Sequence, residues 1–310
     1  MSSRELELAS AAAELWTSPD QEIGYLARLF SQTSLPYQNP GDLPVWYRRN
    51  GALTLTVQPG VRIDAHGNPK SLGYPYGTVP RLLLTWLSTE AVRTKSPELV
   101  LGESLSEFMR KLDLTPTGGK NGTITRLRGQ MERLFQANLS VRIDDGDPDH
   151  QAGAKLSVAS SYDLWWAKGD QPALLPSTVR LTGEFFDEVT TRPVPVDLGA
   201  LRALRRSPMR LDIYAWLTHR MSYLQRQTVI PWEALRFQFG SILKDTKQGR
   251  QQFKRDFERH LKEVLVVYRD ARVEITPAGV VLKPSFTHVP FKGVRALQRS
   301  ADALEGNSFS

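Results

Sequence analysis

The sequence predicts a helix-rich α+β protein made of tandem winged helix-turn-helix domains with β-hairpin wings. The first observation is size, because 310 residues with 40% hydrophobic content can bury two separate cores. The second is periodicity: apolar residues recur at helical spacing in two sets of three segments, each set followed by alternating apolar and polar residues. The third is repetition, because the two sets align at a constant offset of about 130 positions.

Composition shifts and breaker residues divide the chain into four expected parts. These are an N-terminal helical arm (1–45), a first winged-helix domain (46–195), a second one (196–293) and a flexible C-terminal tail (294–310). Within the arm, the pattern predicts helices over 5–16 and 21–30, before a loop rich in proline, asparagine and glycine. The arm and the tail either bind a partner or are disordered, and the pattern does not choose between these.

The first domain opens with strands and continues with helices. From residue 53, the stretch LTLTVQPGVRIDAHGNPKSLGY alternates apolar and polar residues around turn sequences, which is typical of short antiparallel strands. Helical spacing follows at 80–93, 104–112 and 123–137, with Ser104 as the cap of the second helix. Further strands are expected at 139–143, 156–166 and 178–182.

The second domain repeats this order, with helices at 208–224, 231–239 and 247–266 and a hairpin at 272–284. Apolar residues of the two domains share a register. The aligned pairs are Trp86 and Trp216, Leu105 and Leu235, Leu127 and Phe257, Met131 and Leu261, Leu134 and Val264, and Ile143 and Val273. Three helices followed by a two-stranded wing is the layout of a winged helix-turn-helix, whose third helix reads DNA.

The charge balance favours an anionic partner such as nucleic acid. The chain has a net charge of +7 and a pI near 9.6, and residues 236–272 alone hold ten Lys and Arg against five acids. There is no cysteine, which excludes disulfides and thiol catalysis and suits a reducing cytosol. Neither a signal peptide nor a long apolar run is visible, so we expect a cytoplasmic protein that does not contact a membrane.

The helix at 247–266 has two distinct faces. Phe253, Phe257, Leu261 and Val264 fall on one side, which we expect to be core. The other side carries the side chains expected to bind DNA: Lys247, Gln248, Gln251, Gln252, Arg255, Arg259 and Lys262. Arginine can bond guanine and glutamine can bond adenine bidentately, while lysine neutralises phosphate. The alternative is an ordinary solvated face. DNA contact is favoured because this face has one acid, Glu258, on its rim, and because the helix occupies the recognition position.

The equivalent face of the first domain is less basic. It is expected to contact DNA through Lys120, Thr125, Arg126 and Arg128. However, Glu132 stands where Lys262 stands, and Gly129 stands where Arg259 stands. We therefore expect the second domain to supply most of the affinity for DNA. The first domain would add an auxiliary contact, a self-association surface, or both.

Several sites of catalysis or metal binding are excluded by spacing. The stretch TGGKNGT lacks a Walker glycine, because that position is Leu114; it reads as a flexible turn leading into a helix whose amino end could hold a phosphate. The acids at 144–149 miss the EF-hand pattern, because His150 stands where glycine is needed. The five histidines never adopt metal-ligand spacing. We expect no enzyme, no catalytic residue, no bound metal and no cofactor.

The segment 74–135 resembles the plasmid-encoded RepA replication initiators. The residues that carry the resemblance are Tyr76, Gly77, Pro80, Arg81, Thr89, Glu90, Ala91, Leu101, Gly102, Ser104, Leu105, Ser106, Phe108, Thr117, Gly118 and Gly119. The resemblance implies an initiator that binds repeated sites (iterons) in double-stranded DNA at a plasmid origin and helps to open the duplex. It also implies partners, namely the host replicative helicase and initiator proteins, and a homodimer formed through the first domain that represses its own gene.

Two other functions remain open at this point. Winged helices also occur in transcription regulators without a replication role, because fold does not settle function. A third possible function is that of a protein-binding scaffold, which would show no salt-sensitive DNA binding.

Overall fold

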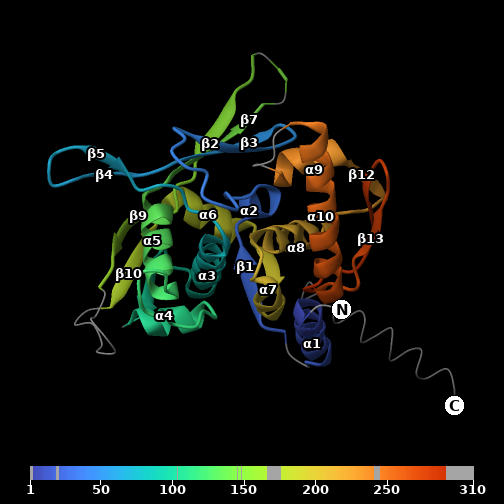
Figure 1. The fold of residues 1–310 in the computed structure, drawn as a ribbon, viewed down its shortest axis with the longest axis horizontal. Coiled ribbons are helices and arrows are strands. Elements are labelled where there is room, and N and C mark those ends of the chain that lie inside the picture. Colours follow the sequence, from blue (N-terminus) through green and yellow to red (C-terminus); the bar gives the residue numbers. More distant parts are fainter. Residues whose placement is uncertain are drawn as a thin grey trace.

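The computed structural model describes residues 3–18, 21–102, 104–144, 146–147, 149–165, 176–240 and 245–290. The predicted C-terminal tail (294–310) lies outside the described residues. Helices and strands are mixed along the chain, which confirms the helix-rich α+β class. In Figure 1, α3, α4 and α5 form one side of the molecule and α8, α9 and α10 the other, with β1 and α2 between them.

The first half contains three helices and a three-stranded antiparallel sheet. In chain order the elements are α3 (Thr78–Thr94), β6 (Glu98–Gly102), α4 (Leu105–Lys111), α5 (Thr123–Gln136), β9 (Ala159–Asp163) and β10 (Ser177–Leu181). The strand order in the sheet is β6-β10-β9. Ser104 caps α4, as predicted, by accepting a hydrogen bond of 3.1 Å from the backbone N–H of Glu107.

The second half has the same order of elements. They are α8 (Pro208–Met221), β12 (Thr228–Pro231), α9 (Trp232–Phe239), α10 (Lys247–Val267), β13 (Arg272–Ile275) and β14 (Gly279–Lys283). The sheet order β12-β14-β13 matches that of the first half strand for strand, and all pairs are antiparallel. The strands β6 and β12, which precede the second helix of each half, were not predicted.

An aromatic contact occurs at the same place in both halves. Trp86 on α3 meets Phe108 on α4 edge to face, with ring centroids 4.9 Å apart. Trp216 on α8 meets Phe239 on α9 in the same manner, at 5.6 Å. Such pairs stabilise beyond the area they bury. The first and second helices of each half are therefore joined by equivalent side chains.

The alignment fails after the third helix. Ile143, which we aligned with Val273, lies in β7 (Asn138–Ile143) rather than in the strand equivalent to β13. By sheet order, the equivalent of β13 is β9. The reason is an insertion in the first half, because β7 and β8 (Ala152–Lys155) stand between α5 and β9.

The inserted strands complete a four-stranded sheet. Its order is β2-β3-β7-β8, with β2 at Trp46–Asn50 and β3 at Leu53–Gln58. Alternate residues of the two central strands point into the first core, where Leu55, Val57, Leu139 and Val141 are buried. A separate hairpin of β4 (Val61–Ile63) and β5 (Pro69–Ser71) projects from the same half (Figure 1).

The N-terminal segment is packed into the body. Helix α1 (Ser3–Thr17) places Leu8 and Ala12 in the second core. The segment 21–30, predicted as one helix, instead forms β1 (Ile23–Leu26) and the start of α2 (Arg28–Gln32). Strand β1 pairs with β11 (Val194–Asp197). Tertiary pairing overrides local helix propensity here. The remaining helices of the described chain are α6 (Gly183–Thr191) and α7 (Leu198–Leu204).

Candidate nucleic-acid interface

Helix α10 is the longest helix of the described chain, with 21 residues. It starts at a cap in which the Thr246 hydroxyl accepts a hydrogen bond of 3.1 Å from the Gly249 N–H. The four apolar residues predicted to face the core, Phe253, Phe257, Leu261 and Val264, are all buried. The core face of α10 is thus confirmed, and its orientation fixes which residues face outward.

Most of the predicted DNA-binding residues of α10 lie on its exposed face. Lys247, Gln248, Gln251, Arg255, Arg259 and Lys262 are exposed, whereas Gln252 is half-buried. At 1.5 Å per residue, the stripe from Gln248 to Lys262 runs for about 21 Å along the helix. The structure therefore brings the predicted residues of this helix together on one continuous surface.

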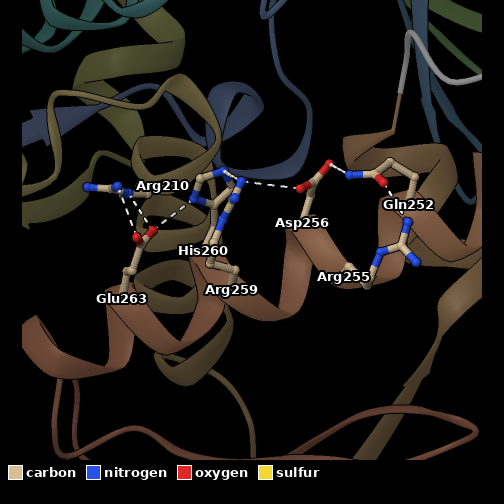
Figure 2. Close-up of polar contacts among 7 residues, drawn as sticks. All are labelled: Arg210, Gln252, Arg255, Asp256, Arg259, His260 and Glu263. Atoms are coloured by element: carbon tan, nitrogen blue, oxygen red, sulfur yellow. Dashed lines mark hydrogen bonds and ion pairs between the residues drawn. The ribbon is translucent and has the colours of Figure 1, made fainter. Parts of the chain in front are cut away.

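Two of these arginines are held by neighbours on the same helix, as Figure 2 shows. The Arg255 guanidinium donates to the Gln252 side-chain oxygen at 2.6 Å, and the Gln252 amide donates to Asp256 at 2.8 Å. Asp256 also forms an ion pair of 3.2 Å with Arg259. The spacing of three or four residues makes these contacts possible. Gln252 and Asp256 thus orient both guanidinium groups.

Asp256 corrects the prediction that this face has one acid. It lies at the edge of the stripe, where it contacts the half-buried Gln252 and the exposed Arg259. The signal in the sequence was its spacing of three residues from Arg259, which places both on neighbouring turns. The cationic surface is therefore less positive, but better ordered, than the sequence suggested.

A second set of contacts fixes the carboxyl-terminal half of α10 to α8. Glu263 bonds His260 at 2.9 Å on the same helix and Arg210 of α8 at 2.6 Å and 3.0 Å (Figure 2). Burial alone would raise the pKa of Glu263, but His260 and Arg210 together lower it. The carboxylate stays charged and anchors the helix, so the exposed face keeps a fixed direction relative to the second core.

Helix α5 carries the corresponding residues of the first half. Lys120, Thr125, Arg126 and Arg128 are exposed, at or near its amino end. The Thr125 hydroxyl donates to the backbone oxygen of Gly119 at 2.9 Å. The predicted residues of α5 lie near one another but on a different half from those of α10.

The turn before α5 is closed by its own hydrogen bonds. The N–H groups of Thr123 and Ile124 both donate to Thr117, at 3.0 Å and 3.3 Å, and the Thr117 N–H donates to the Thr123 hydroxyl at 2.8 Å. A Cβ atom at Gly122 would lie 2.3 Å from two backbone oxygens, so only glycine allows this approach. Two N–H groups at the helix start are therefore already satisfied, which leaves fewer donors for the phosphate that the sequence suggested at this helix end.

Sites of other kinds are not found in the described part of the chain. These residues hold no group of three or more His, Cys, Asp or Glu side chains that could bind a metal ion. Among the same residues, no helix combines the length and apolar character needed to cross a bilayer.

The fold and this surface define a class: a helix-rich α+β protein with two repeated halves, one of which exposes an ordered cationic helix. Residues 74–234 match the family model described as plasmid encoded RepA protein. The match covers just over half of the 310 residues, so the chain belongs to the plasmid-encoded RepA family. This confirms the family predicted from residues 74–135. Helix α10 and the hairpin of β13 and β14 lie beyond the matched residues.

Two solved structures show a weak likeness over most of the chain. Both are crystal structures of domains 2 and 3 of RctB, one of them of a selenomethionine derivative. The derivative matches with a TM-score of 0.46 and 12% identity, covering 80% of this chain and 94% of the other. The second matches with a TM-score of 0.45 and 11% identity, covering 82% and 96%. No curated protein matches the sequence.

Proposed function

We propose that this protein initiates plasmid replication by binding iteron repeats in double-stranded DNA at the plasmid origin. The observation that carries the proposal is the exposed, ordered row of arginine and glutamine on α10, in a chain of the plasmid-encoded RepA family. A protein of this kind acts in the cytoplasm, needs no cofactor and catalyses no reaction of its own. It helps to open the duplex, recruits the host helicase and initiator proteins, and represses its own gene as a dimer.

Each half is proposed to be a winged helix-turn-helix. Helix, strand, helix, helix and hairpin occur in this order in both halves, with β7 and β8 inserted before the hairpin of the first half, and the two sheets have the same strand order. In this assignment α10 is the recognition helix of the second half and α5 that of the first, while the hairpins β13–β14 and β9–β10 are the wings. The proposed domain boundaries are 46–195 and 196–293.

Base reading is assigned to the arginines and glutamines of α10. Arg255 and Arg259 lie four residues apart, so their guanidinium groups stand one turn apart along the groove-facing stripe. Each can bond the O6 and N7 atoms of a guanine, and Gln248 or Gln251 can bond an adenine. Asp256 restricts the direction of Arg259 and repels phosphate. The exposed face of α10 thus favours contacts with the bases over contacts with the DNA backbone. Sequence discrimination requires such base contacts.

The two halves are proposed to divide the work. Helix α10 supplies most of the affinity, whereas Lys120, Thr125, Arg126 and Arg128 of the α5 region add a weaker backbone contact. The first half also provides the surface for homodimer formation.

The test replaces Arg255 and Arg259 by alanine and measures binding to the non-coding DNA of the native plasmid and to random duplex. Each lost base contact should weaken origin binding by about 1 to 3 kcal/mol, with a smaller loss on random DNA. The matched control replaces Arg110 and Arg192, two exposed arginines in α4 and just after α6, by alanine; it removes the same charge and should bind as the wild type does. Unchanged origin binding in the double variant would refute the assignment of α10.

Replication itself separates an initiator from a transcription regulator. A plasmid whose gene carries the double substitution should fail to replicate unless wild-type protein is supplied in trans. If a plasmid lacking the gene still replicates, the protein acts as a winged-helix regulator of transcription instead.

A further inference from the structure

The outward face of the four-stranded sheet β2-β3-β7-β8 is polar and carries no acid. Side chains alternate along a strand, so the residues not directed into the core share this face. They are Tyr47 and Arg49 on β2, Thr54, Thr56 and Gln58 on β3, Asn138, Ser140 and Arg142 on β7, and Gly153 and Lys155 on β8. Three of them are cations, and the rest are hydroxyl or amide side chains and a glycine.

The register places these groups in two parallel rows across the sheet. Tyr47, Thr56, Ser140 and Lys155 are successive cross-strand partners and form one row. Arg49, Thr54, Arg142 and Gly153 form the next. The Thr56 and Ser140 hydroxyl groups hydrogen-bond at 2.6 Å, which ties the two central strands together on this face. Cations and hydroxyls in rows are the groups that bind phosphate oxygens in protein–DNA complexes.

The acids that follow β7 along the chain lie in the turn between β7 and β8. Asp144 and Asp147 accept hydrogen bonds from the backbone N–H groups of Gly146 and Asp149, at 3.3 Å and 3.0 Å. Their carboxylates thus accept hydrogen bonds within the turn, which follows the end of β7 at Ile143. They do not lie among the residues of the two rows, so the rows keep a net positive charge.

The sheet lies beside the helix that precedes α10. The side chains of Asn50, at the end of β2, and Gln238, in α9, both donate to the backbone oxygen of Gln32 at 2.9 Å. Figure 1 shows β2, β3 and β7 at the same end of the molecule as α9. The amino end of α10, with Lys247 and Gln248, is therefore at the same end as the basic rows.

We propose that this sheet face binds the sugar–phosphate backbone of duplex DNA flanking the site that α10 reads. The proposal rests on the proposed function, because it extends the contact made by α10. Charge complementarity favours a polyanion such as the DNA backbone as the partner of this face. The face exposes three cations beside several hydroxyl groups, and none of its residues is acidic. A duplex is favoured over a single strand because the face offers one aromatic ring, Tyr47, whereas single-strand sites stack successive bases on several.

The test uses the full-length protein with Arg49, Arg142 and Lys155 all replaced by alanine. The matched control replaces Arg93, Arg110 and Arg192, three exposed arginines outside the sheet, and so removes the same charge. Binding is measured over a range of salt on a short duplex holding one origin repeat. It is measured again on a duplex extended by about two helical turns, or about 21 base pairs, on each side.

The expected result is a loss of DNA affinity in the sheet variant that is confined to the long duplex. On it, the slope of log affinity against log salt should become shallower by about 2 to 3 in the sheet variant, and affinity should fall about tenfold or more. Binding to the short duplex, and all binding by the control, should stay as in the wild type. Arg142→Lys should keep the wild-type slope because it keeps the charge.

Three outcomes overturn the inference. Equal slopes for wild type and sheet variant on the long duplex would show that the face does not meet DNA. If the sheet variant lost affinity for single-stranded DNA of the same length but not for the long duplex, the face would be assigned to binding a single strand. A loss of dimer in analytical ultracentrifugation, with DNA binding intact, would assign it to a second copy. Failure of wild type to bind the short duplex would instead refute the proposed function.

Discussion

Arg81 and Asp212 join the two halves of the molecule through a buried, two-pronged ion pair. The guanidinium donates to both carboxylate oxygens, at 2.7 Å and 2.8 Å, and both residues are buried. Arg81 lies on α3 and Asp212 on α8, the first helix of each half. The same guanidinium also donates to the backbone oxygens of Leu35 and Gly77, at 2.7 Å and 2.6 Å. This pair fixes how the halves meet.

Removing one partner of this pair should destabilise the whole protein. Asp212→Ala leaves an uncompensated buried guanidinium, at an expected cost of about 3 to 5 kcal/mol in the free energy of unfolding. The double change Arg81→Met with Asp212→Leu removes both charges and should recover much of the loss. Urea unfolding of the three proteins measures this. A single variant as stable as the wild type would contradict the role of the pair.

The two equivalent tryptophans should differ in their contribution to stability. Trp216 is 5% exposed and its ring contacts both Phe239 and Phe257, so Trp216→Ala should cost about 3 to 5 kcal/mol in the free energy of unfolding. Trp86 is only partly buried and makes one such contact, with Phe108, so Trp86→Ala should cost less. Denaturant unfolding compares the two, and equal losses would count against the packing described.

Asp256 should act on selectivity more than on affinity. Asp256→Asn removes a negative charge from the edge of α10 that is proposed to face DNA, and it releases Arg259 from its ion pair. Binding to random duplex should tighten, and the ratio of origin to random affinity should fall, because the freed arginine meets any phosphate. Glu258→Gln, at a rim acid that pairs with Lys254 at 3.8 Å, is the matched control and should keep the ratio. A ratio unchanged by Asp256→Asn would rule out an orienting role.

His219 should make folding sensitive to mild acid. Burial, together with the positive charges of Arg28 and Arg220, lowers the pKa of His219 from 6.5 to about 4. The unfolded chain therefore binds a proton below pH 6.5 that the folded protein does not take up until about pH 4. Stability contributed by the neutral histidine is full above pH 6.5 and is lost as the pH falls through this window.

The measurement is the free energy of unfolding of wild type and His219→Gln at several pH values. Their difference should be constant above pH 7 and should change steadily between about pH 6.5 and 4. A difference that is flat throughout would mean that His219 titrates normally in the folded protein.

Periodicity predicted helices α5 and α10 well because each has one apolar face and one polar face. The spacing of Phe253, Phe257 and Leu261 alone fixed both the helix and its buried side. Short strands outside a hairpin were missed or misassigned, because β1, β6 and β12 adjoin no hairpin turn and depend on partners distant in sequence. Strand β1 exists through its pairing with β11, about 170 residues away.

The sequence predicted which residues of the candidate site lie on the exposed face of α10, but not which side chains of that face contact one another. Helical spacing placed Arg255, Arg259 and Lys262 on one exposed face. It did not show that Gln252 and Asp256 hold the two arginines, because side-chain rotamers decide which of several possible i, i+3 and i, i+4 contacts form. The basic sheet face was also hidden, because its residues come from strands whose pairing order no local pattern encodes.

The backbone carbonyl group of Gln32 links the basic sheet to the helix that precedes α10. Because Asn50 of β2 and Gln238 of α9 both donate to it, the basic sheet is held beside α9, the helix that precedes α10. With both proposed contacts in place, this arrangement would set the length of duplex between a repeat and the flank that the sheet binds. Inserting half a helical turn, about 5 base pairs, there would rotate the flank to the opposite side, out of reach of the sheet.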